Sequence, residues 1–441
     1  MNKEQDQKPF EKVMKFPRIE AITIGVIGLG YVGLPLASAL GKKFKTIGFD
    51  INSLRIEQLS AGKDVTGELS LEELKAGGTL RFSCSESDLF ECDVLIVAVP
   101  TPITKSRTPD LKPLLSASEV VGRCIRKGGV VIYESTVYPG ATEEDCIPVV
   151  ENVSGLRFNV DFFAGYSPER INPGDKDRPI SKIVKVTSGS TPQVAVFVDE
   201  LYGQIIEAGT FKASSIRVAE ASKIIENTQR DVNIALVNEF SMLFANLGID
   251  TNEVLDAAAT KWNFIRLQPG LVGGNCISVD PYYLLHKSIS TGFIPDIIRT
   301  AREINDGMAR NAVDRLVAKM AARSLPLKGA KVLVVGFTFK ENCPDSRNTK
   351  VVDLVSEMGA WGMVTDIVDS WADPDEVLAE YGITIGSALP ESGAYDAIVL
   401  TVAHSDFVAH GPERLRGLLK PNGVLFDMKA AFLKTDSDLR L

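Results

Sequence analysis

A single cysteine stands in a glycine-rich segment, where it could act as a nucleophile. Cys276 ends the segment GGNC (residues 273–276), and Asp280 and Pro281 follow it. The glycines would let a substrate approach the backbone closely, and a helix beginning near Cys276 would favour its thiolate. A lone cysteine is also commonly a buried structural residue, and Asp280 suits a helix N-cap with Pro281 at the first helical position. The segment alone leaves both interpretations open.

Three further residues have side chains suited to acid–base or oxyanion chemistry. Lys223 and Asn227 are four apart in a helical pattern, so they share one face and could hold an oxyanion. Glu169 lies in SPER (residues 167–170), after the apolar run FNVDFFAGY, and is a candidate acid–base residue. The competing interpretations are an exposed lysine on an amphipathic helix and a solvated loop glutamate.

Three glycines, Gly28, Gly30 and Gly33, have the spacing G-x-G-x-x-G between an apolar run and a helical pattern. The first permits a tight turn, the second lets a pyrophosphate approach, and the third lets helix and strand pack closely. The helix N-terminus then attracts the phosphates. Asp50 ends the next apolar run, where it would bind ribose hydroxyls and repel a 2′-phosphate. The pattern predicts NAD rather than NADP. A glycine turn without ligand is the alternative, and an N-cap role for Asp50 would be compatible with ribose binding.

Other polar residues lie near the predicted ends of strands, which in a doubly wound sheet line the crevice that binds a dinucleotide. Arg55 suits the adenine or a phosphate, and a solvated surface position equally well. The segments VPTP (residues 99–102) and STVYPG (residues 135–140) follow apolar runs and would line the crevice, or be turns only. The predicted cofactor contacts are Gly28, Gly30, Tyr31, Val32, Gly33, Asp50, Arg55, Thr101, Ser135 and Thr136.

The elements that must position these residues alternate along the chain. Short β-branched runs at residues 21–30, 45–50, 93–100 and 128–136 predict buried strands, with helical patterns between them. Such alternation predicts a parallel sheet with helices on both faces.

The alternation of predicted strands and helices then stops, and it resumes later in the chain. A long helical pattern runs from about Ala213 to Asn246, and further helical patterns run from about Asp280 to Arg323. Residues 324–340 restart the alternation, and MVTDIVD, AIVLTVAH and GVLFDMK predict later strands. The expected architecture is α/β, with two Rossmann-like doubly wound domains joined by a long central helical segment.

The composition excludes several classes of protein. A net charge of -9 without a long basic run argues against nucleic-acid binding. The polar N-terminus is not a signal peptide, no apolar run is long enough for a membrane span, and the six scattered cysteines suit a reducing compartment. None of them forms a C-x-x-C pair, so no metal site is expected. We therefore expect a cytoplasmic enzyme.

Seven motifs in order extend this interpretation. They are GVIGLGYVGLPLA, AVPTP, ESTVYPG, SPER, ASKIIENTQRDVNIALVNE, GLVGGNCISVDPYYL and GFTFKENCPDSRNTK. With them, the chain from about Ala21 to Lys429 resembles the UDP-glucose/GDP-mannose dehydrogenase family, and within it the UDP-N-acetylhexosamine 6-dehydrogenases.

The resemblance implies a domain order and binding partners. After a tail at residues 1–20, it implies an NAD-binding domain at 21–207, a helical dimerisation and catalytic segment at 208–323, and a UDP-sugar-binding domain at 324–441. The second α/β domain lacks the three-glycine fingerprint, so a second dinucleotide site is not expected. The implied partners are NAD, a UDP-sugar and a second copy of the chain.

The resemblance also implies residue roles. Cys276 resembles the nucleophile and Asp280 its partner, while Thr136 and Glu169 resemble the residues that position the catalytic water. Lys223 and Asn227 resemble the pair that stabilises negative charge on substrate oxygen. The implied substrate contacts are Glu169, Arg170, Lys223, Asn227, Arg266, Gly273 and Lys340, and Arg347 is an implied cofactor contact.

The implied reaction is the four-electron oxidation of a C6 alcohol to the acid through a cysteine thioester, for surface polysaccharide precursors. UDP-N-acetylglucosamine is expected first, UDP-N-acetylgalactosamine closely second, and UDP-glucose is the alternative. Asn233, Trp262, Asn263 and Arg266 are possible partners for the N-acetyl group. Asn275, where this subgroup commonly has His, and Arg266, where it has an apolar residue or Pro, depart from the pattern and bear on sugar choice. A 6-phosphogluconate or 3-hydroxyacid dehydrogenase and a non-enzymatic nucleotide sensor are the rival classes.

Overall fold

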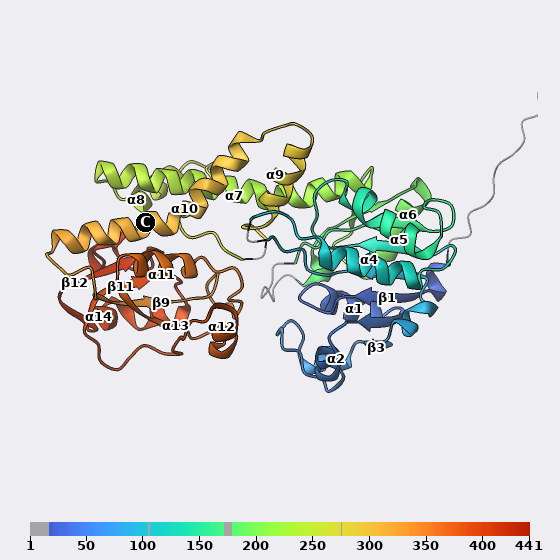
Figure 1. The fold of residues 1–441 in the computed structure, drawn as a ribbon, viewed down its shortest axis with the longest axis horizontal. Coiled ribbons are helices and arrows are strands. Elements are labelled where there is room, and N and C mark those ends of the chain that lie inside the picture. The colour runs from blue at the N-terminus through green and yellow to red at the C-terminus, as the bar shows by residue number, and fades with distance from the viewer. Residues whose placement is uncertain (1–16, 105, 172–178, 275) are drawn as a thin grey trace, which may run out of the picture. The chain divides into compact units, whose positions relative to one another are not determined.

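The structure, a computed structural model, describes residues 17–104, 106–171, 179–274 and 276–441. The chain divides into two compact units, of which the N-terminal unit ends at Ile224 and the C-terminal unit begins at Ile225. The boundary falls inside the long helix α7 (Ile216–Leu247), which therefore contributes residues to both units (Figure 1). The predicted three-domain bounds remain a prediction.

The described residues of the N-terminal unit form an eight-stranded sheet in the order β3-β2-β1-β4-β5-β6-β7-β8. Its strands are β1 (Thr23–Ile27), β2 (Lys45–Phe49), β3 (Leu80–Ser83), β4 (Val94–Val97), β5 (Val130–Tyr133), β6 (Phe163–Tyr166), β7 (Lys185–Gly189) and β8 (Thr210–Lys212). The first six strands pair in parallel and in the order of a doubly wound sheet. The pairing of β6 with β7 is antiparallel, so the expectation of a parallel sheet holds except at this step.

Alternate residues of these strands face helices on opposite sides of the sheet. The helices are α1 (Gly33–Gly41), α2 (Ser53–Ser60), α3 (Leu71–Lys75), α4 (Lys112–Cys124), α5 (Ile147–Ser154) and α6 (Pro192–Gly203). Ile24 and Val26 of β1 share a buried cluster with Leu36 of α1 and Leu201 of α6. On the other face, the hydroxyl groups of Ser118 of α4 and Tyr133 lie 2.8 Å apart. Because both faces are covered, the strands are apolar on both sides.

The C-terminal unit contains most of α7 and a second sheet. Its other helices are α8 (Thr251–Ala259), α9 (Asp280–Ser290), α10 (Asp296–Ala322), α11 (Val351–Ala360), α12 (Pro374–Tyr381), α13 (Ser405–Ala409) and α14 (Gly411–Arg416). Its strands are β9 (Lys331–Val335), β10 (Val364–Val368), β11 (Tyr395–Leu400), β12 (Leu419–Asp427) and β13 (Leu439–Arg440). They pair in parallel in the order β10-β9-β11-β12-β13.

This sheet also buries both of its faces. Val332 and Val334 of β9 pack in one cluster with Leu316 of α10 and Leu354 of α11. Leu333 of β9 packs in the opposite cluster with Phe407 of α13. The predicted class is thereby confirmed: two doubly wound α/β sheets are joined in the chain by a long helix (Figure 1). Among the described residues, no helix is both long and apolar enough to cross a membrane.

Candidate active site

The turn between β1 and α1 has the geometry that its three glycines predict. Gly28 has a φ of 95°, which a side chain would strain, and a Cβ on Gly33 would lie 1.8 Å from the carbonyl oxygen of Gly28. A Cβ on Gly30, in contrast, would meet no described atom within 4 Å. The packing of the chain therefore requires Gly28 and Gly33, whereas the absence of a side chain at Gly30 leaves room above the turn.

Asp50 lies at the end of β2, beside this turn. Its Oδ2 accepts a hydrogen bond of 2.9 Å from the backbone N–H of Leu29, and its Oδ1 accepts one of 2.9 Å from Asn52. The N-cap of α2 is Asn52, whose side chain accepts from the backbone of Arg55, so the N-cap interpretation of Asp50 is wrong. Asp50 is only partly buried, and each carboxylate oxygen has a second lone pair available for a ribose hydroxyl.

Arg55 is buried beneath the glycine turn. Its Nε and Nη2 donate to the carbonyl oxygen of Leu29 at 3.1 and 3.0 Å, and it forms an ion pair of 2.7 Å with Asp64. The solvated surface position is therefore wrong for this residue, because its guanidinium supports the turn from below. Contact of Arg55 with the cofactor remains a prediction.

The turns after β4 and β5 are joined by hydrogen bonds. The hydroxyl of Ser135 donates to the carbonyl oxygen of Val99 at 2.6 Å, and the hydroxyl of Tyr166 donates to the carbonyl oxygen of Ser135 at 3.2 Å. Thr101 and Thr136 are partly exposed in the same two turns. The structure thus ties together the two strand ends that were predicted to line the crevice, as doubly wound sheets do at their carboxyl edge.

Sequence reasoning missed a buried carboxylate that holds the second of these turns. Glu220, on α7, accepts backbone hydrogen bonds from Gly140 at 2.5 Å and from Thr142 at 2.9 Å. Burial raises the pKa of Glu220 to about 7. Nothing in the run VAEASK distinguishes Glu220 from a solvated helix residue, because its partners are about 80 residues away in sequence.

Glu169 is buried, so the solvated-loop interpretation is wrong. Its Oε1 accepts from the backbone N–H groups of Arg170, at 2.5 Å, and Ile171. The guanidinium of Arg170 donates to the carbonyl oxygen of Val184 at 3.0 Å. The two N–H groups fix the carboxylate of Glu169 in one orientation, as an acid–base residue requires.

Lys223 and Asn227 lie one turn apart on α7, and both side chains are about 8% exposed. Lys223, in the N-terminal unit, is therefore not the exposed lysine of the competing interpretation. Asn227, in the C-terminal unit, donates from Nδ2 to Oδ2 of Asp280 at 2.6 Å. Asp280 begins α9 after the N-cap position Val279, so the N-cap interpretation of Asp280 is wrong as well.

Cys276 is exposed, which excludes a buried structural cysteine. Its carbonyl oxygen accepts from the N–H groups of Val279 at 3.1 Å and Asp280 at 2.8 Å, so a tight turn leads from Cys276 into α9. Asn275 lies outside the described residues. Asp280, the first residue of α9, is thereby hydrogen-bonded through its backbone to Cys276.

The two glycines before Cys276 serve the packing of the chain itself. A Cβ on Gly273 would lie 2.7 Å from the carbonyl oxygen of Asn348, and one on Gly274 would lie 2.9 Å from the ring of Phe339. The close approach expected for a substrate is thus made by residues 339–348. This contact brings Gly273 and Lys340 to the same small cavity, which Lys350 and Lys429 also line.

Two further predicted residues, Arg347 and Arg266, have partners within the C-terminal unit. Arg347 forms a bidentate pair with Asp345 at 2.9 and 2.7 Å, and Arg266 donates to Asp256 at 3.1 and 2.6 Å. Trp262 is 91% exposed. Contact of these residues with a ligand remains a prediction.

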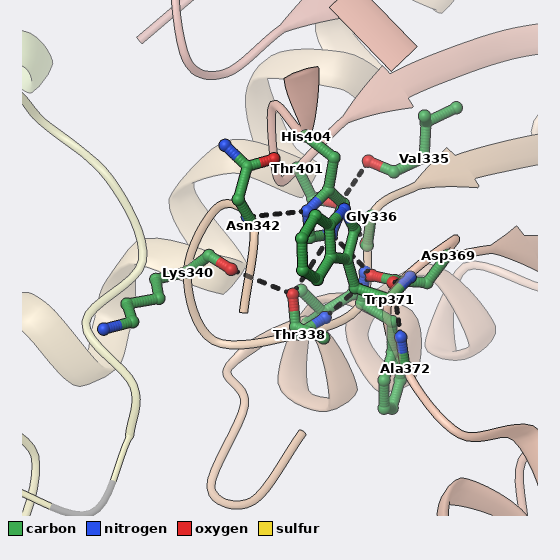
Figure 2. A network of polar contacts seen from close by, with 12 residues as sticks. Val335, Gly336, Thr338, Lys340, Asn342, Asp369, Trp371, Ala372, Thr401 and His404 are labelled. Atoms are coloured by element: carbon green, nitrogen blue, oxygen red, sulfur yellow. Dashed lines mark hydrogen bonds and ion pairs between the residues drawn. The ribbon is translucent and has the colours of Figure 1, made fainter. Parts of the chain in front are cut away.

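A second missed network builds the segment that carries Lys340 (Figure 2). Nε2 of His404 lies 2.9 Å from Oδ2 of Asp369 and 3.1 Å from the hydroxyl of Thr338, and Nδ1 accepts from the N–H of Asn342 at 2.9 Å. Because a backbone N–H only donates, the hydrogen of the imidazole is on Nε2. Figure 2 shows the Lys340 side chain directed away from this network. Within the described residues, no group of His, Cys, Asp and Glu could hold a metal ion.

The turn after β1 fits a dinucleotide on structural grounds. It offers an uncovered Gly30, a helix N-terminus and a partly exposed carboxylate at the end of the next strand. Three family models match successive parts of the chain, in the order of the domains that the sequence predicts. They describe the UDP-glucose/GDP-mannose dehydrogenase family: its NAD binding domain at residues 22–206, its central domain at 217–307 and its UDP binding domain at 333–434.

Similar proteins cover almost the whole chain. A UDP-N-acetyl-D-glucosamine 6-dehydrogenase of Pseudomonas aeruginosa is 57% identical over 95% of this chain and 99% of its own length. One of Salmonella typhi is 51% identical over 96% and 99%. The solved structure of a UDP-D-ManNAc dehydrogenase from Pyrococcus horikoshii has a TM-score of 0.84 at 28% identity, over 94% of this chain and 96% of that one.

The chain belongs to the UDP-glucose/GDP-mannose dehydrogenase family. It is an NAD-dependent nucleotide-sugar dehydrogenase with a UDP-binding domain. The predicted family, enzyme class and cofactor are confirmed, and the rival 6-phosphogluconate dehydrogenase and sensor interpretations are wrong.

Proposed function

We propose that this enzyme oxidises the C6 alcohol of UDP-N-acetylglucosamine to the carboxylate, for surface polysaccharide precursors. The observation that carries the choice of sugar is the 57% and 51% identity to two UDP-N-acetyl-D-glucosamine 6-dehydrogenases over nearly full length. UDP-N-acetylgalactosamine differs only in the direction of one hydroxyl, so it is the closest competitor.

The proposal assigns NAD to the turn after β1. Gly28, Gly30 and Gly33 would hold the pyrophosphate at the N-terminus of α1, and Asp50 would hold the adenosine ribose. When bound, NAD supplies the hydride acceptor for both oxidations. The other proposed cofactor contacts are Tyr31, Val32, Arg55, Thr101, Ser135, Thr136 and Arg347.

The proposed chemistry uses Cys276 because an alcohol becomes an acid only if an aldehyde is converted to a tetrahedral alkoxide. Loss of the first hydride and the hydroxyl proton gives the C6 aldehyde. The sulfur of Cys276 then bonds to C6, and the carbonyl oxygen becomes the oxyanion of a thiohemiacetal. Loss of a second hydride gives a thioester. Water adds to C6, the C–S bond breaks, and the acid and the free thiol are released.

The positions of the polar residues support their proposed roles. The Asn227 amide is held by Asp280 at 2.6 Å, so with Lys223 it would stabilise the oxyanion, while Asp280 handles the thiol proton. Glu169 and Thr136 would position and deprotonate the water. Arg170, Arg266, Gly273 and Lys340 are the proposed further contacts of the sugar nucleotide.

We also propose that the enzyme forms a homodimer through α7. Leu236, Leu243 and Leu247 are each about half exposed, and their spacing places them on one face of the helix. Exposed apolar side chains aligned on one helix face are typical of an interface.

The test of the proposed function is the ratio of kcat/KM for UDP-N-acetylglucosamine, UDP-N-acetylgalactosamine and UDP-glucose, read as NADH absorbance. We expect the first to be best and UDP-glucose to be at least about tenfold worse, since a site that holds an amide loses a partner without it. Higher efficiency with UDP-glucose would contradict the assignment. Cys276→Ala should form no acid while binding NAD normally.

A further inference from the structure

Four polar side chains that come from different parts of the N-terminal unit meet in its interior. Nζ of Lys185, on β7, lies 2.7 Å from Oε2 of Glu134, at the end of β5, and 3.5 Å from Oε2 of Glu169. The hydroxyl of Tyr202, on α6, donates to Oε1 of Glu134, and Nζ of Lys185 lies 5.4 Å from the centre of the Tyr202 ring. Lys185 is 3% exposed and Glu134 is fully buried. The proposed function leaves Glu134, Lys185 and Tyr202 without a role.

The two oxygens of Glu169 have different surroundings. Oε1 accepts from two backbone N–H groups, those of Arg170 and Ile171. Oε2 is buried and makes no hydrogen bond to the part of the chain that the structure describes, although the ammonium of Lys185 lies 3.5 Å away. A buried carboxylate oxygen with unused lone pairs needs a partner, and a water molecule would supply one.

The charges in this cluster keep Lys185 ionised. Burial works against the charge of Lys185, but the two carboxylates outweigh it, so the pKa of Lys185 is raised above its ordinary value. Burial raises the pKa of Glu134 and, more strongly, that of the Tyr202 hydroxyl. Lys185 is therefore a permanent cation beside Oε2 of Glu169. The remaining charged neighbour in the loop, Arg170, donates to the carbonyl oxygen of Val184.

We propose that Lys185 is a positioning residue for hydrolysis, held by Glu134 and Tyr202 so that Oε2 of Glu169 is directed at the attacking water. This inference rests on the proposed function, because it concerns the step that releases the acid. In that step Oε2 takes one proton from water, the water oxygen bonds to C6, and the electrons of the C–S bond go to the sulfur of Cys276.

A purely structural ion pair would satisfy Lys185 and Glu134 equally well, and many buried ion pairs have no further role. The position of Glu169 argues for more. Oε2, which has no hydrogen bond to the described residues, faces the ammonium of Lys185. Oε1 alone accepts the backbone hydrogen bonds that fix the orientation of the carboxylate. If Lys185 is a positioning residue, its loss slows the hydrolysis of the thioester. If the ion pair is only structural, its loss lowers the free energy of unfolding instead.

The test compares charge-matched variants of the full-length enzyme. The double variant Lys185→Met/Glu134→Gln removes the cation without leaving Glu134 as an unpaired buried anion. The single variant Lys185→Arg keeps a cation at this position. Lys182→Met is the control, since Lys182 is an exposed lysine three residues earlier. Glu169→Gln removes the base itself. Each variant is mixed with NAD and UDP-N-acetylglucosamine, quenched in acid and weighed by mass spectrometry for an adduct on Cys276.

We expect the double variant to lose about 100-fold in kcat, the order of one general base, and to accumulate the Cys276 adduct as Glu169→Gln does. The acid limb of its kcat–pH profile should move to higher pH, because a carboxylate without a neighbouring cation keeps its proton longer. Lys185→Arg should recover most of the rate, and Lys182→Met should behave as the wild type.

Other outcomes separate the inference from the proposed function. A double variant that folds but gives no adduct and an unmoved acid limb would overturn the role of Lys185. If the double variant fails to fold, Tyr202→Phe, which removes one hydrogen bond to Glu134 and keeps Lys185, is compared with the wild type, and unchanged kcat, adduct level and acid limb in that variant overturn the role of Lys185. If Glu169→Gln gives no adduct, or the wild type gives no NADH, the proposed function fails instead.

Discussion

The turn after β1 and the turn after β9 begin with the same backbone conformation. Gly28 and Gly336 have φ values of 95° and 94°. A Cβ on Gly28 would lie 2.8 Å from the carbonyl oxygen of Ala98, just after the neighbouring strand β4. A Cβ on Gly336 would lie 2.6 Å from that of Val402, just after the neighbouring strand β11. The first turn continues with two more glycines, whereas the second continues with Thr338, Phe339 and Lys340. The shared first glycine is thus required by the close approach of the neighbouring strand's end, and it does not by itself identify a dinucleotide site.

The carboxylates beside the two turns differ more. Asp50 ends β2, is partly exposed and accepts from two backbone N–H groups, of which one belongs to the turn. Asp369, which follows β10 in the same way, is fully buried. Its oxygens accept from Phe337, Thr338, Trp371, Ala372 and the imidazole of His404 (Figure 2). In one unit the acid can still bind a ribose; in the other it stabilises the fold.

The largest expected effect of this difference is on stability. Asp369→Ala would leave five donors without their acceptor, and we expect the free energy of unfolding to fall by more than about 3 kcal/mol. Asp50→Ala should change it by less than about 1 kcal/mol, because Asp50 is only partly buried and accepts two hydrogen bonds instead of five. Urea unfolding of both variants measures this. Equal losses would mean that the two carboxylates have the same role.

The next effect is on the cofactor. Asp50→Ala should weaken NAD by about 1.5–3 kcal/mol, or roughly 10- to 100-fold in KM, by removing charged hydrogen bonds to the ribose. Asp50→Asn, which keeps the size and removes the charge, should narrow the preference for NAD over NADP. An unchanged preference in both variants would show that Asp50 does not contact the ribose.

Asp369 also predicts a pH dependence. Burial raises the pKa of Asp369, but the hydrogen bonds from His404, Phe337 and Thr338 together outweigh it and hold this pKa at about 2 instead of 3.8. A carboxyl whose pKa is lowered by folding stabilises the folded state above its unfolded pKa, and this contribution is lost as the pH falls from 4 to 2. The loss should be about 2 kcal/mol. Urea unfolding across this range should show a smaller loss for Asp369→Asn, and an equal slope in that variant would refute the assignment.

The smallest effect concerns Gly30. A methyl group there meets no described atom of the chain, so Gly30→Ala should leave the melting temperature nearly unchanged. It would occupy the space proposed for the pyrophosphate and should weaken NAD about tenfold. Gly33→Ala is the matched variant, because its methyl group collides with the turn and should destabilise the protein first. Normal NAD affinity in Gly30→Ala would place the pyrophosphate elsewhere.

The sequence predicted the parts of the fold that depend on local pattern. The glycine turn, the strand ends and the long helix α7 all follow from residue spacing, since Gly28 needs a positive φ within the turn and Gly33 meets the carbonyl oxygen of Gly28. The antiparallel step to β7 was missed, because pairing direction depends on a distant strand and not on the residues of β7.

The candidate site divides in the same way. Burial of Lys223 and Glu169 and the role of Asp280 beside Asn227 could not be predicted, because each depends on contacts between distant segments. Lys185 and Glu220 carried no motif at all. A lysine inside the apolar run KIVKVTSG was the one visible signal, since a charged residue within a buried strand needs a partner.

The most direct test of the proposed chemistry is the number of NADH molecules formed per UDP-N-acetylglucosamine at limiting sugar and excess NAD. Because Cys276 would carry the aldehyde on to a thioester, we expect about two NADH per sugar and a carboxylate product. One NADH per sugar, with the aldehyde as product, would contradict the covalent four-electron oxidation proposed for Cys276.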